Sequence, residues 1–192
     1  YATDQKIKWS RSLLSDDEIW IGTLGYGLVS PDFIITNQPF KRVNDLLRYK
    51  GNVVVAADKG TFIYDGNKFV TLTEEPTRSL AVLNNTLYLG SKTNGVYSWK
   101  NSVLSKENFS WSDNIYFIRS TDEQYLWVGT EKGIQKIYWK NGVQQSAYIG
   151  SNVGLLGVET CTNSFCASEK GVWCGTIEGL VYIPKNYSAQ NI

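Results

Sequence analysis

Five short stretches of the chain are strongly apolar, and each ends in a small residue that is followed by a glycine and a second apolar run. The apolar stretches are rich in β-branched and aromatic residues, which is typical of strands, and helical spacing is nowhere sustained. A glycine between two such runs indicates a tight hairpin. Each copy therefore predicts two antiparallel strands. The copies lie at residues 19–23, 53–57, 87–91, 126–130 and 172–176, with hairpin glycines at Gly27, Gly60, Gly95, Gly133 and Gly179.

The spacing of the copies predicts the fold. Measured from Gly22 through Ala56, Gly90 and Gly129 to Gly175, the intervals are 34, 34, 39 and 46 residues. One four-stranded blade of a β-propeller takes about 40 residues. In each blade a strand A nearest the axis precedes the motif strand B, which is followed by C and an outer strand D. The segments expected to form strand A are 7–14, 43–49, 78–83, 115–120 and 158–167.

The sequence thus predicts an all-β protein, a β-propeller of about five four-stranded blades. The repeats extend over residues 1–192 as one domain, and the last blade ends near residue 184. No basic segment followed by an apolar run opens the chain, so we expect any signal peptide to lie outside this stretch. No apolar stretch approaches the roughly 20 residues of a membrane-spanning helix.

Charge and residue types narrow the possible functions. The 19 Lys and Arg nearly balance the 18 Asp and Glu and are scattered along the chain, so the basic stripe of a nucleic-acid-binding protein is missing. The sequence has no histidine, which excludes Ser-His-Asp and Cys-His mechanisms among these residues. We expect no catalytic residue, no metal site and no cofactor. Three cysteines lie close together, and the sequence leaves open whether Cys166 and Cys174 are bridged.

The motif resembles the repeat of the two-component regulator propeller family, which reads roughly Ile-Trp-Ile-Gly-Thr followed by Gly-Leu. The first, fourth and fifth copies fit best, whereas the second has Val54 and Ala56 in place of the aromatic residue and the glycine. The closing stretch 179–184 is similar to the last blade of that family's propellers. The best copies read Ile19-Trp20-Ile21-Gly22-Thr23, Leu126-Trp127-Val128-Gly129-Thr130 and Val172-Trp173-Cys174-Gly175-Thr176.

The resemblance implies a periplasmic or extracellular part of a membrane protein, namely the sensor of a hybrid two-component system that often detects an oligosaccharide. An immunoglobulin-like domain and a histidine kinase would follow in the same parent protein. That family usually has more than five blades, which leaves two arrangements open. The chain is part of a larger propeller, or five blades close here and residues 1–7 supply the missing outer strand of the last blade. The exposed edges of an open arc favour the first.

Two sets of residues are candidates for packing and for binding. Trp20, Trp127 and Trp173 recur in the aromatic position of strand B, so we expect them to pack between blades. The residue before each hairpin glycine varies although its surroundings repeat, and variable positions on a repeated scaffold commonly form a binding surface. We expect these candidates to lie on one face of the propeller: Tyr26, Lys59, Asn94, Lys132 and Glu178. Further aromatic residues suited to packing, and less so to stacking on sugars, are Tyr97, Trp99, Trp111, Tyr138 and Trp139.

Three classes of function remain. The first is a non-enzymatic sensor that binds an oligosaccharide or another small-molecule signal on one face. The second is a scaffold for protein interaction, including a homodimer, without a small ligand. The third is a propeller enzyme such as a lyase or glycosidase, which the missing histidine disfavours because histidine is the commonest general base.

Overall fold

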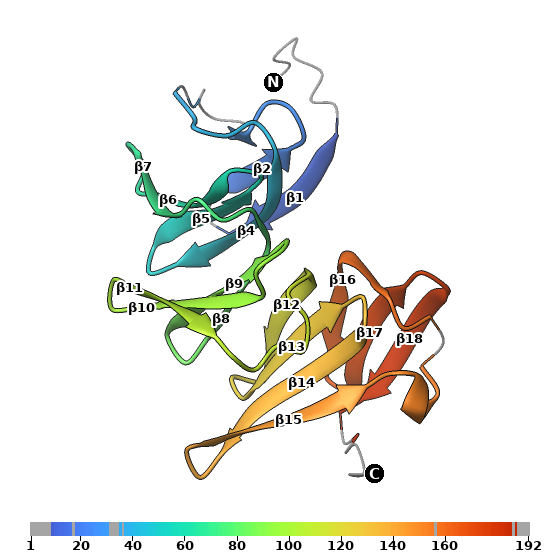
Figure 1. The fold of residues 1–192 in the computed structure, drawn as a ribbon. Helices are drawn as coiled ribbons and strands as arrows, with labels where there is room; N and C mark the ends of the chain where they lie inside the picture. Colours follow the sequence, from blue (N-terminus) through green and yellow to red (C-terminus); the bar gives the residue numbers. More distant parts are fainter. Residues whose placement is uncertain are drawn as a thin grey trace. The chain divides into compact units, whose positions relative to one another are not determined.

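The computed structural model describes residues 9–16, 18–30, 35, 37–155, 157–185 and 187, which form five antiparallel sheets (Figure 1). The first two sheets contain β1 (Ser10–Ser15), β2 (Ile19–Thr23) and β3 (Leu28–Val29), then β4 (Val43–Tyr49), β5 (Asn52–Ala57), β6 (Gly60–Tyr64) and β7 (Phe69–Thr73). The third contains β8 (Thr77–Leu83), β9 (Thr86–Ser91), β10 (Val96–Lys100) and β11 (Val103–Glu107). The last two contain β12 (Ile115–Thr121), β13 (Tyr125–Thr130), β14 (Gly133–Lys140) and β15 (Val143–Ile149), then β16 (Thr160–Ser168), β17 (Gly171–Thr176) and β18 (Gly179–Pro184).

These sheets are the blades of a β-propeller, and the predicted fold class is confirmed. Each motif forms the second strand of its blade and pairs with the third strand across the predicted hairpin. Within the described residues the middle three blades have four strands, and the first and fifth have three. Residues 1–7, the proposed outer strand of the last blade, lie outside the described residues.

Helical structure is almost absent from the described residues. A single 3-10 turn, Ser151–Val153, lies between β15 and β16. No helix in the described part of the chain is long and apolar enough to cross a membrane. The chain divides into two compact units, Tyr1–Arg78 and Ser79–Ile192. The first unit holds the first two blades and the second holds the third to fifth, with β8 beginning just before the boundary.

The small residue of the motif is required by close packing. A Cβ atom added to Gly129 would lie 2.1 Å from the ring of Phe117, and one added to Gly22 would lie 2.5 Å from Cγ1 of Val43 in the next blade. Such contacts are far shorter than van der Waals distance, so a larger residue would force neighbouring strands apart. Ala56 fills this position in the second blade and is fully buried.

Two of the three motif tryptophans pack between blades as predicted. Trp20 contacts the ring of Tyr64 in the second blade edge-on, with centroids 5.7 Å apart, and it belongs to the core of the first unit. Trp127 is 2% exposed and lies 6.1 Å from the ring of Phe165 in the fifth blade. Both interfaces gain the large stabilisation of buried aromatic surface.

The prediction is wrong for Trp173. Its side chain is 41% exposed, and its ring lies 4.7 Å from that of Tyr182 in the neighbouring strand of the same sheet. The cause is the position of the fifth blade, which is the last blade of the second unit among the described residues, so no later blade of that unit packs on this face. A repeated motif therefore places the tryptophan on the same face each time but does not by itself bury it.

Candidate functional site

The five candidate residues occupy equivalent turns. Each lies between the second and third strand of its blade, immediately before the glycine that closes the hairpin. These glycines all have positive φ, from 75° at Gly27 to 147° at Gly179, which explains why glycine recurs there. The first unit contributes Tyr26 and Lys59, and the second contributes Asn94, Lys132 and Glu178.

A hydroxyl group fixes the backbone of most of these turns. In the first blade, Thr23 Oγ1 accepts a 2.8 Å bond from the amide of Tyr26 and donates a 2.9 Å bond to the carbonyl of Gly27. Thr130 likewise accepts from the amide of Lys132 at 3.0 Å and donates to the carbonyl of Gly133 at 3.1 Å. The Thr or Ser that ends the motif is thus a turn cap. The second blade has Ala57 in this position and lacks the cap.

The turns are also held by the connections between blades. The amide of Gly95 donates a 2.8 Å bond to the carbonyl of Asp113, and the amide of Ile177 donates a 3.0 Å bond to that of Glu159. In the first unit, the amide of Gly27 bonds the carbonyl of Lys41 at 2.9 Å. Each of these turns therefore lies beside a connection that leads from one blade to the next. The candidate side chains project from a fixed backbone.

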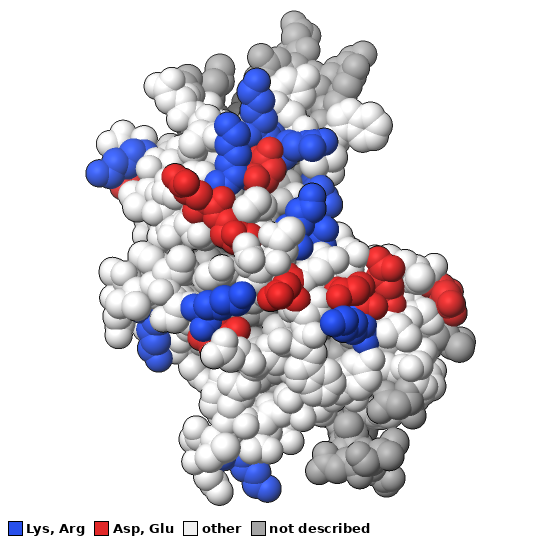
Figure 2. Space-filling view, in the orientation of Figure 1, with Lys and Arg blue, Asp and Glu red and all other residues white. Residues whose placement is uncertain are grey.

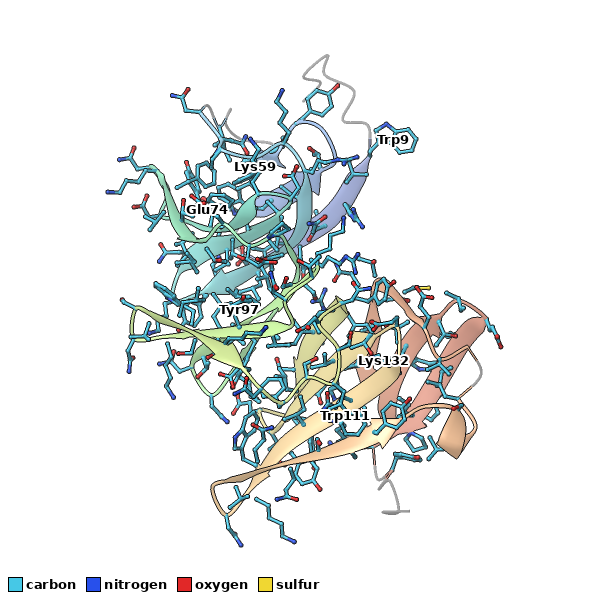
Figure 3. The ribbon with its side chains drawn as sticks, in the orientation of Figure 1. Trp9, Lys59, Glu74, Tyr97, Trp111 and Lys132 are labelled. Carbon is cyan, nitrogen blue, oxygen red and sulfur yellow. The ribbon has the colours of Figure 1, made fainter. Side chains whose placement is uncertain are left out.

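The fourth blade gathers the largest group of side chains suited to binding. The hydroxyl of Tyr148 donates to the carbonyl of Lys132, and the ring of Tyr148 lies 4.9 Å from that of Trp111 at an interplanar angle of 39°. Trp111 is 51% exposed, so one face of this aromatic pair is open to solvent. Figure 3 shows Lys132 and Trp111 on the same unit, next to β14. An open aromatic surface beside the backbone of Lys132 results.

A carboxylate completes this group. Ser112 Oγ lies 2.8 Å from both carboxylate oxygens of Glu131, the residue before Lys132. The same hydroxyl accepts a 2.9 Å bond from the amide of Asn114. The connection that carries Trp111 is anchored further by Gln135, whose Nε2 donates a 2.7 Å bond to the carbonyl of Phe109. Hydrogen bonds therefore hold the Glu131 carboxylate, Tyr148 and the connection that carries Trp111 in place before any ligand arrives.

The structure joins some of the predicted residues more directly than others. The amide of Gly95, in the turn that carries Asn94, donates to the carbonyl of Asp113. Asp113 belongs to the connection between β11 and β12, which also carries Trp111. The turn of Glu178 bonds the connection that precedes the fifth blade. Tyr26 and Lys59 belong to the other unit. The role of these five residues in binding stays a prediction.

Sequence reasoning missed three contributors to the group: Ser112, Glu131 and Tyr148. Glu131 could have been found, because it stands next to Lys132 in the same turn. Tyr148 and Ser112 come from the end of a strand and from a connection, and neither carries a local pattern that predicts its partner. Only the pairing of strands brings Tyr148 back to Lys132.

Charges on the surface are intermixed. Figure 2 shows basic and acidic side chains near one another on the visible face, separated by uncharged areas. Among the described residues, no group of three or more Cys, Asp or Glu side chains is arranged to hold a metal ion.

The three cysteines are free thiols. Cys166 pairs with Trp173 across the strands, and Phe165 pairs with Cys174, so the thiols of Cys166 and Cys174 lie on opposite faces of the sheet. A bridge between them is therefore excluded by geometry.

Comparison with known proteins supports the fold. No protein-family model and no curated relative matches the sequence. Among solved structures, a similar one is the extracellular domain described as belonging to the hybrid two-component system BT4673 from B. thetaiotaomicron. It is 21% identical, with a TM-score of 0.73 over 96% of this chain and 27% of that chain. The chain thus spans about a quarter of the length of that neighbour.

Two further neighbours have other functions. Virginiamycin B lyase from Staphylococcus aureus is 14% identical, with a TM-score of 0.64 over 96% of this chain and 72% of that chain. PorZ, a surface component of the type-IX secretion system of Porphyromonas gingivalis, is 11% identical, with a TM-score of 0.65 over 96% and 34%. At these identities the likeness shows the propeller fold and leaves function to be argued from the site.

Proposed function

We propose that the chain is a non-enzymatic sensor propeller of an extracytoplasmic, two-component signalling protein, and that it binds a carbohydrate through its B–C turns. In the parent protein an immunoglobulin-like module and a histidine kinase would follow it. The motif and the likeness to the BT4673 domain support the signalling role. The absence of histidine from the sequence weighs against an enzyme.

One observation carries the binding proposal. The open face of the Trp111 and Tyr148 pair lies beside the backbone of Lys132 and the carboxylate of Glu131. A sugar ring offers a face of C–H groups that packs on an aromatic ring, and its hydroxyls accept from ammonium groups and donate to carboxylates. The site combines an apolar surface with a few polar groups, as recognition sites do.

A calorimetric screen of oligosaccharides against the whole chain tests the proposal. Replacing Lys132 by alanine should weaken binding of any sugar found by about tenfold or more, because its side chain would supply a direct contact. The melting temperature should hardly change, since exposed side chains contribute little to stability. Lys140→Ala is the matched control, because Lys140 is an exposed lysine at the other end of β14.

Two results would contradict the proposal. A broad screen that finds no saturable binding would leave the chain without a sugar ligand. Full affinity in Lys132→Ala would show that binding occurs elsewhere on the molecule.

A second candidate function, protein interaction or homodimerisation, is favoured by the uncovered face and turn of the fifth blade. Its exposed apolar side chains are Trp173, Ile177, Leu180 and Tyr182. Light scattering should then show a molecular mass that rises with protein concentration. Leu180→Asp should reduce this association, because a charge disfavours apolar contact. A mass of one chain at all concentrations would dismiss the homodimer.

A further inference from the structure

A groove lies between the fourth and fifth blades, apart from the group of side chains around Lys132. It has a volume of 530 Å³ and lies at the A–B turns, the ends of the strands away from Lys132. All of its lining residues belong to the second unit. Its walls include Asp122 and Tyr125 from the fourth blade, Ala167 and Glu169 from the fifth, and the side chain of Lys136.

Lys136 is the unusual group in this groove. It lies on β14 directly opposite Trp127 and is only 7% exposed. Its ammonium lies 4.0 Å from the ring centroid of Tyr125 and 5.2 Å from that of Trp127. Among the residues that the structure describes, it makes these cation–π contacts but no hydrogen bond or ion pair. Burial lowers the pKa of Lys136, with Asp122 partly opposing the effect.

The cation distinguishes the fourth blade from the second, third and fifth. The residues that face the aromatic position from strand C in those three blades are Ile63, Ser98 and Tyr182. None of these carries a positive charge. A repeat that only needed to pack would not place an ammonium here, because burying an unpaired cation costs free energy.

In the corresponding groove between the first and second blades, the cation is paired with a carboxylate. There Arg48, paired with Val53 across the strands, forms two bonds to the carboxylate of Asp16, at 2.7 and 2.8 Å. The residue in the same register of the fifth blade is Ala167, which is paired with Val172. No guanidinium therefore extends from the fifth blade into the second unit's groove.

The carboxylates near Lys136 do not neutralise it. Asp122 is bonded to Lys185 at 3.2 Å, so this carboxylate is already paired with another cation. Glu169 lies in the exposed turn of the fifth blade. Ser120, Thr121 and Ser168 add hydroxyl groups to the wall. The groove thus offers one nearly buried cation, aromatic rings and hydroxyls without an internal anion for the cation.

We propose that this groove binds a small organic carboxylate, whose anionic group pairs with the ammonium of Lys136. A bound carboxylate would offset the burial of the ammonium, and charged hydrogen bonds are among the stronger ones in proteins. Thr121, whose hydroxyl accepts from the indole of Trp127, would donate to a further oxygen of the ligand. The inference is independent of sugar binding at the B–C turns, because the two sites lie at opposite ends of the strands.

Nuclear magnetic resonance of the whole chain tests this site with two small carboxylates, succinate and benzoate, each beside its neutral amide. The indole N–H of Trp127 donates a 2.9 Å bond to Thr121 in the groove wall, so its signal is a local reporter. That signal is identified as the one lost in Trp127→Phe. A carboxylate should shift it saturably in the millimolar range, and the amide should bind at least about tenfold more weakly.

Three variants separate the site from general charge attraction. Lys136→Met keeps the aliphatic stem and should abolish the preference for carboxylate over amide. Ala167→Arg reproduces the arrangement of Arg48 and Asp16 in the groove between the first and second blades. Its side chain should block binding by occupying the space beside Asp122. Lys140→Met, at an exposed lysine of the same strand, should bind as the parent chain does.

Several outcomes would overturn the proposal. These are no saturable shift with either carboxylate, equal binding of carboxylate and amide, an unchanged preference in Lys136→Met, or the same shift with sodium sulfate at matched ionic strength. If Lys136→Met fails to fold, Ala167→Arg decides, because its side chain replaces a methyl group that is already exposed. Loss of sugar binding in Lys132→Ala would not affect this test.

Discussion

The fourth and fifth blades carry nearly the same motif in different surroundings. The fourth is covered on both faces, with Trp127 and Val128 buried on opposite sides of β13. The fifth has one covered face, which includes Val172 and Cys174, and one open face, which includes Trp173. The motif thus determines which face each side chain points to, whereas the neighbouring blade determines how much the side chain stabilises the fold.

The largest expected difference between the two blades is at the motif tryptophan. Trp127→Ala should lower the free energy of unfolding by about 3 to 5 kcal/mol, because it removes a large side chain from a buried interface. Trp173→Ala should cost only about 1 kcal/mol, because that side chain is already partly in water. Urea denaturation of both variants gives the two values. Equal costs would contradict the comparison and indicate that the open face of the fifth blade is covered in solution.

The motif glycine should show a smaller difference. Gly129→Ala should cost about 2 to 3 kcal/mol, because the added methyl group meets the rigid ring of Phe117. Gly175→Ala should cost about 1 kcal/mol, because it meets Ser164, a small side chain in the irregular part of β16. Thermal melts rank the two variants. A smaller loss of stability in Gly129→Ala than in Gly175→Ala would show that the fourth blade is packed less tightly than its contacts indicate.

The turn cap should cost the same in both blades. Thr130→Val and Thr176→Val each remove a hydroxyl that donates a 3.1 Å bond to the carbonyl of the hairpin glycine. The hydroxyl of Thr130 also accepts from the amide of Lys132, so we expect each variant to lose about 1 to 2 kcal/mol, at about 1 kcal/mol for each hydrogen bond of the hydroxyl. A much smaller loss for Thr176→Val, measured by urea denaturation, would mean that the cap depends on the neighbouring blade.

Thiol chemistry should distinguish the two faces of the fifth blade without changing stability. Burial raises the pKa of Cys174 to about 12, so at pH 8 this group stays a protonated thiol and reacts poorly. Its reactivity should rise only as the pH approaches that value. Cys166 is exposed and should react first with iodoacetamide. Mass spectrometry after a short reaction identifies the alkylated residue, and early modification of Cys174 would contradict the burial of this face.

Much of the fold could be predicted because its signals are local and repeated. Strand B, the hairpin glycine and the blade spacing are all read within one repeat, and the five motif strands form as expected. The exposure of Trp173 could not be predicted, since it depends on where the blade stands in the series. The motif at Trp173 is nearly identical to that at Trp127.

The candidate sites were predicted less completely, because their residues meet through pairing of distant segments. Lys132 was expected in a binding turn, but its association with Trp111 requires Tyr148 from the end of the outer strand. Lys136 stands within an apolar run that reads simply as a strand. Its importance emerges only from the absence of a cation at Ala167, a residue of another blade.

The capped turns have a consequence for how such a protein can change. In the first, third and fourth blades the hydroxyl that ends the motif bonds the amide of the variable residue, and the glycine that follows takes the positive φ. The side chain of the variable residue takes no part in forming the turn. Mutation can therefore replace Tyr26, Asn94 or Lys132 with almost any amino acid at little thermodynamic cost. The scaffold is evolvable at these positions, and a library randomised there should yield folded variants with new binding preferences.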